Sequence, residues 1–348
     1  MPSGPQARAD AEPAAGSSED GQRSDRERVL SELRRATKLV VVTHEHPDGD
    51  ALGSLVAMQE ILSCLGRDSL MFIDPGDFPL PEEYDFLPLP RLIDVPPDDV
   101  DERTIVFLDC GNIERTPAQV FQRPGVQIVN IDHHHDNTRF GTINYVRPDA
   151  SCTAEIVWEL MHELSVKPNA TIAEALYVGL ITDTGRFMYE NTGSRAHVMA
   201  AELIEAGVDV HEVYRRVYED VPYAKVALLA RGLQKIERYD DGRLTVSALD
   251  AADFTNAGAE ASYSEGLVDL LRSVRGTVVA ALVRQRMENG DGSAQHKVSL
   301  RSSDDSVDVS RIARAQGGGG HRQAAGFTTG MSHQELVRFL REEVAAQL

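Results

Sequence analysis

The amino-acid sequence predicts an α/β protein with a larger first domain and a smaller second one. Continuous runs of Val, Ile and Leu alternate with helix-length, apolar-faced segments in the first two thirds of the chain, as in sheets whose strands are buried on both faces. A length of 348 residues makes two domains the natural expectation. An Asp-Asp-Gly turn at residues 240–242 then opens a second group of strand-like runs.

The expected elements follow from apolar periodicity, taken in chain order. Residues 1–24 are rich in Ala, Ser, Gly, Pro and charge without such periodicity, so we expect a disordered leader there. The segments 75–101 and 144–151 are expected to be loops. Strands are expected over residues 39–42, 69–74, 104–108, 126–131, 244–249, 277–284 and 297–303. Helices are expected over residues 24–36, 51–65, 152–164, 172–180, 194–206, 222–236 and 309–315.

Composition narrows the class of protein. With 42% hydrophobic and 26% charged residues, the chain has the make-up of a globular protein. No apolar run reaches the length of a membrane span, and the N-terminus lacks the basic-then-apolar order of a secretory signal. The three cysteines, Cys64, Cys110 and Cys152, have no paired spacing for zinc or redox chemistry. We therefore expect a cytoplasmic protein without a membrane partner.

The net charge of −20 argues against binding long duplex nucleic acid, which needs a basic surface. The charge is unevenly distributed. Residues 261–348 hold 11 basic and 10 acidic residues, whereas residues 1–260 hold 24 and 45. An anionic substrate could still bind if metal ions occupy the acidic part and arginines approach from the neutral part.

The stretch Thr43–Asp50 is the first candidate site. His44, Asp48 and Asp50 lie within seven residues at the carboxyl end of a predicted strand, where open α/β sheets bind their ligands. Gly49 allows a tight backbone between the two acids. Because carboxylates this close resist ionising together, the cluster favours a divalent metal ion. The alternative is an ordinary solvated turn in which an Asp caps the following helix.

Three later elements end in similar residues. Asp109 follows the third predicted strand, where alone it could equally be a turn or cap residue. Asp183–Arg186 ends a predicted helix, and Arg186 could meet phosphate, although a helix C-cap fits as well. The run Asp132–Asp136 follows the fourth strand and contains three consecutive histidines. One of these can bind metal while its neighbour faces substrate, and Asp132 can fix a ring tautomer; a solvated loop is the alternative.

The second domain contributes a glycine run, Gly317–Gly320, followed by His321. Four glycines let the backbone approach a ligand closely and present N–H groups to oxyanions. A flexible linker is the alternative, but a linker is not expected between a helix and a strand of a small domain. Arg301 and His321 are the candidate phosphate and base contacts from this domain.

Together these motifs resemble those of the DHH/DHHA1 phosphoesterases, in the order of that family and over residues 27–345. Within the family, the chain looks most like the short, stand-alone nanoRNases and phosphoadenosine-phosphate (pAp) phosphatases, some relatives of which also cleave cyclic di-AMP or pApA. The matching motifs are His44-x3-Asp48-x-Asp50, Asp109, Asp132-His133-His134, Asp183-Thr184-Gly185 and the Gly317–Gly320/His321 loop.

The resemblance implies a domain plan and an assembly. A catalytic domain with a central parallel sheet flanked by helices would span residues 25–220, and a helical connector residues 221–240. A smaller α/β substrate-binding domain would span residues 241–348, with the active site in the cleft between the domains. Relatives in this family are often homodimers, so a homodimer is expected.

The resemblance also implies the residues of the site and two Mn²⁺ ions, with Mg²⁺ or Co²⁺ as substitutes. One ion would take His44, Asp48 and Asp109, and the other Asp50, Asp109, His133 and Asp183. His134 and Asp109 would be catalytic, Asp132 would orient a neighbouring histidine, and the role of His135 is open. The substrate contacts would be Arg186, Arg301, Ser302, Gly318, Gly319, Gly320 and His321.

The expected function is hydrolysis of short oligoribonucleotides to mononucleotides and of pAp to AMP, with pApA and cyclic di-AMP as further candidate substrates. Two nearby cations would generate hydroxide at neutral pH and neutralise a phosphoryl oxygen. One alternative is a soluble manganese-dependent inorganic pyrophosphatase, but the Ser-Arg-Lys-type loop of those enzymes is replaced here by the glycine run. A catalytically silent nucleotide sensor is the other, and the intact set of candidate ligands argues against it.

Overall fold

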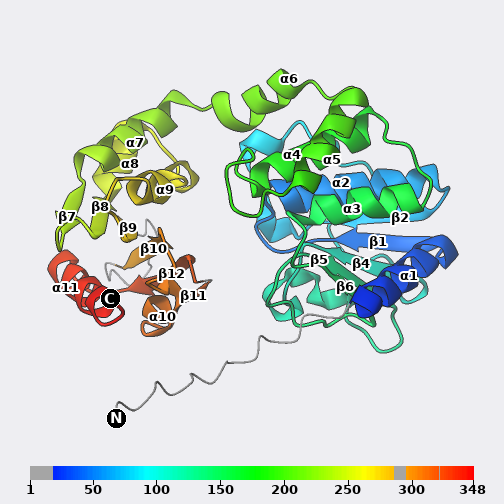
Figure 1. Cartoon of the computed structure of the whole chain (residues 1–348), viewed down its shortest axis with the longest axis horizontal. Coiled ribbons are helices and arrows are strands. Elements are labelled where there is room, and N and C mark those ends of the chain that lie inside the picture. Colours follow the sequence, from blue (N-terminus) through cyan, green and yellow to red (C-terminus); the bar gives the residue numbers. More distant parts are fainter. Residues whose placement is uncertain (1–18, 286–294, 321) are drawn as a thin grey trace, which may run out of the picture. The chain divides into compact units, whose positions relative to one another are not determined.

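The computed structural model describes residues 19–285, 295–320 and 322–348, which form two compact units (Figure 1). The first unit ends at Asp220 and the second begins at Val221. Each is built around its own six-stranded sheet, which confirms the predicted two-domain α/β class. None of the helices in this described part combines the length and the apolar character needed to cross a bilayer.

The sheet of the first unit is entirely parallel. Its spatial order is β3-β2-β1-β4-β5-β6, so β1 (Lys38–Val42) and β4 (Thr104–Leu108) are neighbours where the order of the strands reverses. In open sheets of this kind, ligands bind beyond the carboxyl ends of the strands at that point. The other strands are β2 (Asp68–Phe72), β3 (Leu92–Ile93), β5 (Ile128–Asp132) and β6 (Ile143–Val146).

Both faces of this sheet are buried because its strands carry apolar side chains on each side. Leu39 and Val41 face the core shared with the helices, whereas Val40 and Val42 face a smaller core that includes Phe107. In Figure 1, α2 to α5 lie together on one side of the sheet, and α2 packs against both α3 and α4. The helices are α1 (Glu19–Arg35), α2 (Gly49–Cys64), α3 (Thr153–Glu163), α4 (Ala170–Asp183), α5 (Ser194–Glu205) and α6 (Val210–Tyr214). Short helical turns occupy Pro75–Asp77, Glu82–Tyr84, Val100–Glu102, Ile113–Arg115, Pro117–Phe121 and Arg215–Glu219.

The structure differs from the expected elements at three places in this unit. The loop expected over residues 144–151 is wrong at its start, because β6 begins at Ile143. β6 is a short edge strand. The Asn144 side chain forms hydrogen bonds with the backbone of Gly141, and Asn and Gly are residues typical of turns. β3 lies within the expected loop 75–101 and is too short for periodicity to reveal. Helix α1 begins at Glu19, inside the expected leader, of which residues 1–18 lie outside the described part.

The sheet of the second unit is mixed, with the order β11-β12-β10-β9-β8-β7, and only its β8–β9 pair is parallel. α10 and α11 contribute to the core on one face, and α7, α8 and α9 to the core on the other. The strands are β7 (Glu237–Tyr239), β8 (Leu244–Leu249), β9 (Val279–Gln285), β10 (His296–Ser302), β11 (Gly319–Gly320) and β12 (Ala324–Thr329). The helices are α7 (Tyr223–Gln234), α8 (Ala251–Ala257), α9 (Leu267–Arg272), α10 (Val309–Arg314) and α11 (His333–Ala345), with a helical turn at Ala261–Ser264.

Candidate metal centre

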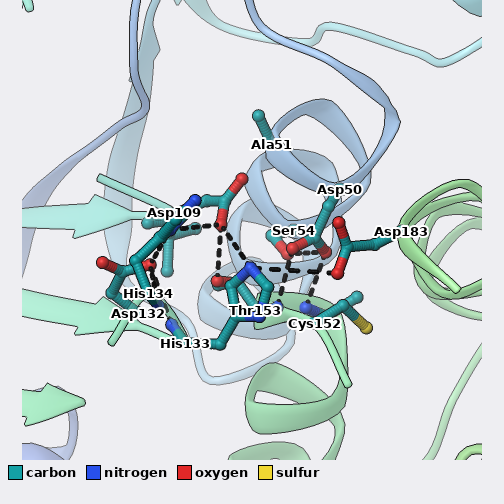
Figure 2. A network of polar contacts seen from close by, with 12 residues as sticks. Asp50, Ala51, Ser54, Asp109, Asp132, His133, His134, Cys152, Thr153 and Asp183 are labelled. Carbon is teal, nitrogen blue, oxygen red and sulfur yellow. Dashed lines mark hydrogen bonds and ion pairs between the residues drawn. The ribbon is translucent and has the colours of Figure 1, made fainter. Parts of the chain in front are cut away.

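Polar residues from four segments of the first unit meet beyond the carboxyl ends of its strands. His44 lies in the segment between β1 and α2, Asp109 directly follows β4, and His133 directly follows β5. Asp183 is the last residue of α4. Because β1, β4 and β5 are adjacent and parallel, the residues beyond their carboxyl ends converge on one place, as Figure 2 shows for Asp109, His133 and Asp183.

These residues belong to three overlapping groups of potential metal ligands. In each group, one ligand atom of every residue lies within 4.8 Å of the others. Asp109 connects them, since its Oδ2 lies 3.5 Å from His44 Nε2 and its Oδ1 lies 3.5 Å from His133 Nε2. One group is His44, Asp48 and Asp109, another is Asp50, His133 and Asp183, and the third is Asp109, Asp132, His133 and His134. The other five residues that the sequence suggested as ligands are thus gathered around Asp109.

Burial makes most carboxylates of this cluster hard to ionise. It raises the pKa of Asp50 well above the usual value, and the charges of Asp109 and Asp183 add to the effect. Burial likewise raises the pKa of Asp183 to about 7. Asp109 is the exception, because the hydrogen bond to His44 and the charge of His133 outweigh its burial and lower its pKa. A bound cation stabilises such a cluster, because its charge favours the ionised form of every carboxylate at once.

The donor atoms suit a hard or borderline divalent cation. They are carboxylate oxygens and imidazole nitrogens, a combination that favours Mn²⁺, Mg²⁺ or Co²⁺. Structural zinc sites, in contrast, are rich in thiolates. The two cysteines nearby are engaged otherwise. The Cys110 thiol points to Asn112 O at 3.7 Å, and burial raises its pKa to about 12. The Cys152 sulfur accepts a hydrogen bond from Glu155 N and caps α3.

The N-terminus of α3 holds two of the carboxylates in place (Figure 2). Thr153 N donates to Asp50 Oδ2 at 2.7 Å and Ala154 N to Asp50 Oδ1 at 2.8 Å. The Thr153 hydroxyl donates to Asp109 Oδ1 at 2.9 Å. A Cβ added at Gly179 would lie 2.9 Å from Asp50 Oδ1 and 2.7 Å from Ala154 Cβ, so only glycine fits there. Analysis of the sequence missed Thr153, because its partners are 44 and 103 residues away.

Asp48 caps a helix and also borders the ligand cluster. Its Oδ1 accepts hydrogen bonds from Asp50 N at 3.0 Å and Ala51 N at 3.1 Å at the start of α2. The capping alternative is therefore correct and is compatible with metal binding through the other oxygen. Gly49 is needed for a different reason from the one expected, since a Cβ there would lie 2.5 Å from the Thr182 side chain.

The histidine run is organised by Asp132, whose side chain is fully buried. Its Oδ1 accepts from His134 Nδ1 at 2.8 Å and from His133 N at 2.8 Å, and its Oδ2 accepts from Asn137 Nδ2. The sequence suggested that Asp132 orients the ring of a ligating histidine; in the structure its ring partner is His134. This bond outweighs burial and raises the pKa of His134 to about 10. His135 is exposed and outside the ligand groups.

Two of the residues near the cluster have strained backbones. Asp109 has φ +57°, and Arg186 has φ +62°, a conformation that costs about 1–3 kcal/mol for a residue other than glycine.

Asn191 Nδ2 anchors the segment after α4 by donating to Asp183 Oδ2 at 3.2 Å and to Ser151 O at 2.8 Å. The Arg186 guanidinium lies 5.0 Å from the centre of the Tyr218 ring.

The predicted substrate contacts of the second unit have mixed outcomes. Arg301 Nε lies 3.3 Å from Asp269 Oδ1 and the side chain is partly exposed. The Ser302 hydroxyl is buried and donates to Asp304 O at 2.6 Å, so this side chain does not present its hydroxyl to a ligand. Gly319 and Gly320 form β11, and a Cβ at Gly318 would lie 2.2 Å from Gly326 O. His321 lies outside the described residues.

Family models match most of the chain. A model of the N-terminal domain of the DHH family matches residues 38–180, and a model of the DHHA1 domain matches residues 241–347. The chain is 33% identical to the bifunctional oligoribonuclease and PAP phosphatase NrnA of Thermus thermophilus, over 91% of this chain and 94% of that protein. It is 28% identical to the protein of the same name from Bacillus subtilis, over 90% of this chain and 97% of that protein.

The fold also has close structural relatives. An exopolyphosphatase-related protein from Bacteroides fragilis aligns with a TM-score of 0.84 and 24% identity over 93% of this chain and 96% of that one. RecJ from Thermus thermophilus aligns with a TM-score of 0.53 and 15% identity over 94% of this chain and 54% of that one. At these identities the structural likeness establishes the fold alone.

Proposed function

The chain belongs to the DHH family of phosphoesterases and is a hydrolase, and from this premise we propose that it cleaves short oligoribonucleotides to mononucleotides and pAp to AMP. One observation carries the proposal. Asp109 and five side chains from three other segments converge and offer oxygen and imidazole donors suited to a two-cation centre. The two NrnA relatives, which match nearly the full length of the chain, support the choice of substrate.

The residues of this chain divide the work between holding cations and moving a proton. His44, Asp48 and Asp109 would hold one Mn²⁺, and Asp50, Asp109, His133 and Asp183 the other. When bound, two such cations would lower the pKa of a water molecule and offset charge on a phosphoryl oxygen. Asp109 can serve both ions because Thr153 and two imidazoles fix its carboxylate from different sides.

His134 is the proposed proton donor to the leaving oxygen. Its Nδ1 is bonded to the buried Asp132, which orients the ring and stabilises its charged form. The ring also lies close to the centre, since His134 Nδ1 is 3.7 Å from Asp109 Oδ1. An imidazole held in this way can protonate a departing alkoxide as the phosphoester bond breaks.

We assign recognition of the nucleotide to the second domain. The proposed catalytic domain spans residues 25–220, the connector 221–240 and the substrate-binding domain 241–348. Within the last, the guanidinium of Arg301 is available to a phosphate at its exposed edge, and the backbone N–H groups of Gly319 and Gly320 are candidate anion contacts. Arg186 is the proposed phosphate contact in the first domain.

The decisive experiment compares substrates side by side. Purified protein with Mn²⁺ is offered pAp, pApA, cyclic di-AMP, a five-residue RNA and pyrophosphate, and kcat/KM is measured for each, with chelator-treated protein as the control. We expect turnover of the RNA and of pAp, and its loss with chelator. A preference for pyrophosphate would identify a pyrophosphatase instead, and binding of nucleotides without turnover would identify a sensor.

Three finer points belong to the same proposal. We assign Mn²⁺ as the preferred ion, a homodimer as the assembly and the cytoplasm as the place of action. Metal analysis of the protein as purified and native mass spectrometry test the first two, and cell fractionation tests the third. Activity on pApA and cyclic di-AMP is decided by the substrate comparison.

A further inference from the structure

Arg284 of β9 is a partly buried cation without a carboxylate partner. Its guanidinium donates to two hydroxyl groups, Ser264 Oγ at 2.8 Å and Ser299 Oγ at 3.2 Å. Among the described residues, no carboxylate oxygen lies within ion-pair distance of it, and Glu265 acts only from farther away. Within the described part of the chain, its buried Nε has no hydrogen-bond partner. Burial lowers the pKa of this guanidinium from its usual value.

This arrangement differs from that of three arginines that have carboxylate partners. Arg301 and Arg272 both lie close to Asp269, and Arg147 is paired with Asp149 and Glu159. Buried charges are normally compensated in this way, because a solitary one is costly. The two serines fix the direction of the Arg284 guanidinium but do not neutralise it. An anion is the ligand that completes such a site.

Arg284 shares one face of the sheet with Ser299 and Arg301. In the antiparallel pairing of β9 with β10, Ser299 lies opposite Leu282 and Arg301 opposite Ala280. Residues two apart on a strand share a face, so Arg284, Ser299 and Arg301 all lie on the face that α9 partly covers. On the next strand, Gly326 lies opposite Ser299 and Ala324 opposite Arg301, so only small residues flank the two arginines there.

We propose that Arg284 binds a phosphate of an RNA substrate other than the phosphate assigned to Arg301. This inference rests on the proposed function. Ser299, which anchors the Arg284 guanidinium, is about 7 Å along the strand from Arg301, so the two arginines serve different phosphates. pAp has one phosphate at the reacting centre and one for Arg301, but none for Arg284. Arg284 therefore favours oligoribonucleotides over pAp.

The test measures RNA binding separately from hydrolysis. Fluorescence anisotropy with a labelled five-residue RNA, in the presence of chelator, gives Kd for the wild type, Arg284→Gln and Arg338→Gln. Arg338 is the matched control, because it is exposed on α11, whose apolar residues pack on the opposite face of the sheet. We expect Arg284→Gln to weaken RNA binding about tenfold and Arg338→Gln less than about twofold. The slope of log Kd against log salt concentration should fall by about 0.7 for Arg284→Gln.

Hydrolysis then tests the preference. Arg284→Gln should lower kcat/KM for the RNA about tenfold, mainly through KM, and leave pAp within about twofold of the wild type. Arg284→Lys keeps the charge without the planar fork, so its kcat/KM for the RNA should lie between those of the wild type and Arg284→Gln. It also replaces Arg284→Gln in the comparison if that variant does not fold. Unchanged RNA affinity, equal losses on RNA and pAp, or a wild type that does not bind RNA would each overturn the role of Arg284. A wild type that binds RNA but hydrolyses neither substrate would refute the proposed function, while the anisotropy still decides on Arg284.

Discussion

Replacing Thr153 by valine tests whether Asp109 is the shared ligand of a metal centre. The substitution keeps the shape of the side chain and removes only the hydroxyl that donates to Asp109 Oδ1 at 2.9 Å. Both residues are buried, so water cannot replace the lost donor. The backbone N–H of residue 153, which holds Asp50, is unaffected.

The expected magnitude follows from this contact. A hydrogen bond to a charged, buried group contributes about 1.5–3 kcal/mol, so the free energy of unfolding should fall by about that amount. Because the hydroxyl also fixes the orientation of a proposed ligand, the affinity for Mn²⁺ should fall about 10- to 100-fold. Thermal unfolding in chelator measures the first effect, and calorimetric titration of the metal-free protein with Mn²⁺ measures the second.

Thr104→Val is the matched control. The Thr104 hydroxyl donates to the buried carboxylate of Glu32 at 2.6 Å, at the amino end of the same β4 strand whose carboxyl end leads to Asp109. It should destabilise the protein by a similar amount and leave Mn²⁺ affinity unchanged. If the two variants lose Mn²⁺ affinity equally, or if folded Thr153→Val binds Mn²⁺ like the wild type, Thr153 does not act through a metal ligand.

Three further predictions concern the shared ligand, the proposed phosphate contact Arg301 and the dependence of stability on pH. Asp109→Asn should abolish turnover of every substrate and remove the stabilisation by Mn²⁺; measurable turnover of any phosphodiester at the wild-type rate contradicts the shared-ligand role. Arg301→Gln should raise KM for RNA and pAp about tenfold but spare bis-nitrophenyl phosphate, whereas equal losses on all three would place Arg301 in the chemistry rather than in binding. In chelator, the midpoint of thermal unfolding should fall as pH rises from about 4 through about 7. The pKa of Asp50 and of Asp183 is raised in the folded state. Their contribution to the free energy of unfolding is therefore complete while they are protonated and is lost as they ionise. With saturating Mn²⁺ the fall should disappear, since the cation stabilises the ionised form; a midpoint that rises with pH in chelator would show that these carboxylates are not buried as described.

Much of the site could be predicted because its residues follow apolar strands directly in the sequence. Asp109 and His133 each come immediately after a run of buried residues, and strand periodicity is a local signal. The contacts that hold these residues are not local. Thr153 reaches Asp109 and Asp50 only because α3 packs beside α2 at the edge of the sheet, and no pattern in the sequence records that packing.

Choices between neighbouring residues were also beyond local patterns. The sequence shows that Asp132 precedes three histidines, but which ring it binds depends on the backbone turn after β5, and the structure selects His134. Ser302 follows Arg301 and looked like a second phosphate contact; alternation along β10 places it on the opposite, buried face. Arg284 attracted no attention because its charge becomes unusual only when its neighbours are known to be serines.

The central position of Asp109 follows from the order of the strands rather than from spacing in the chain. β4 lies between β1 and β5, so a residue at its carboxyl end has neighbours on both sides, whereas His44 after β1 and His133 after β5 each face it from one side. Any carboxylate placed there can be shared between two groups of ligands. The same position explains its lowered pKa, because Asp109 lies between the imidazoles of His44 and His133. Reversal of the strand order at β1 and β4 therefore places this residue where the proposed shared ligand would have to lie.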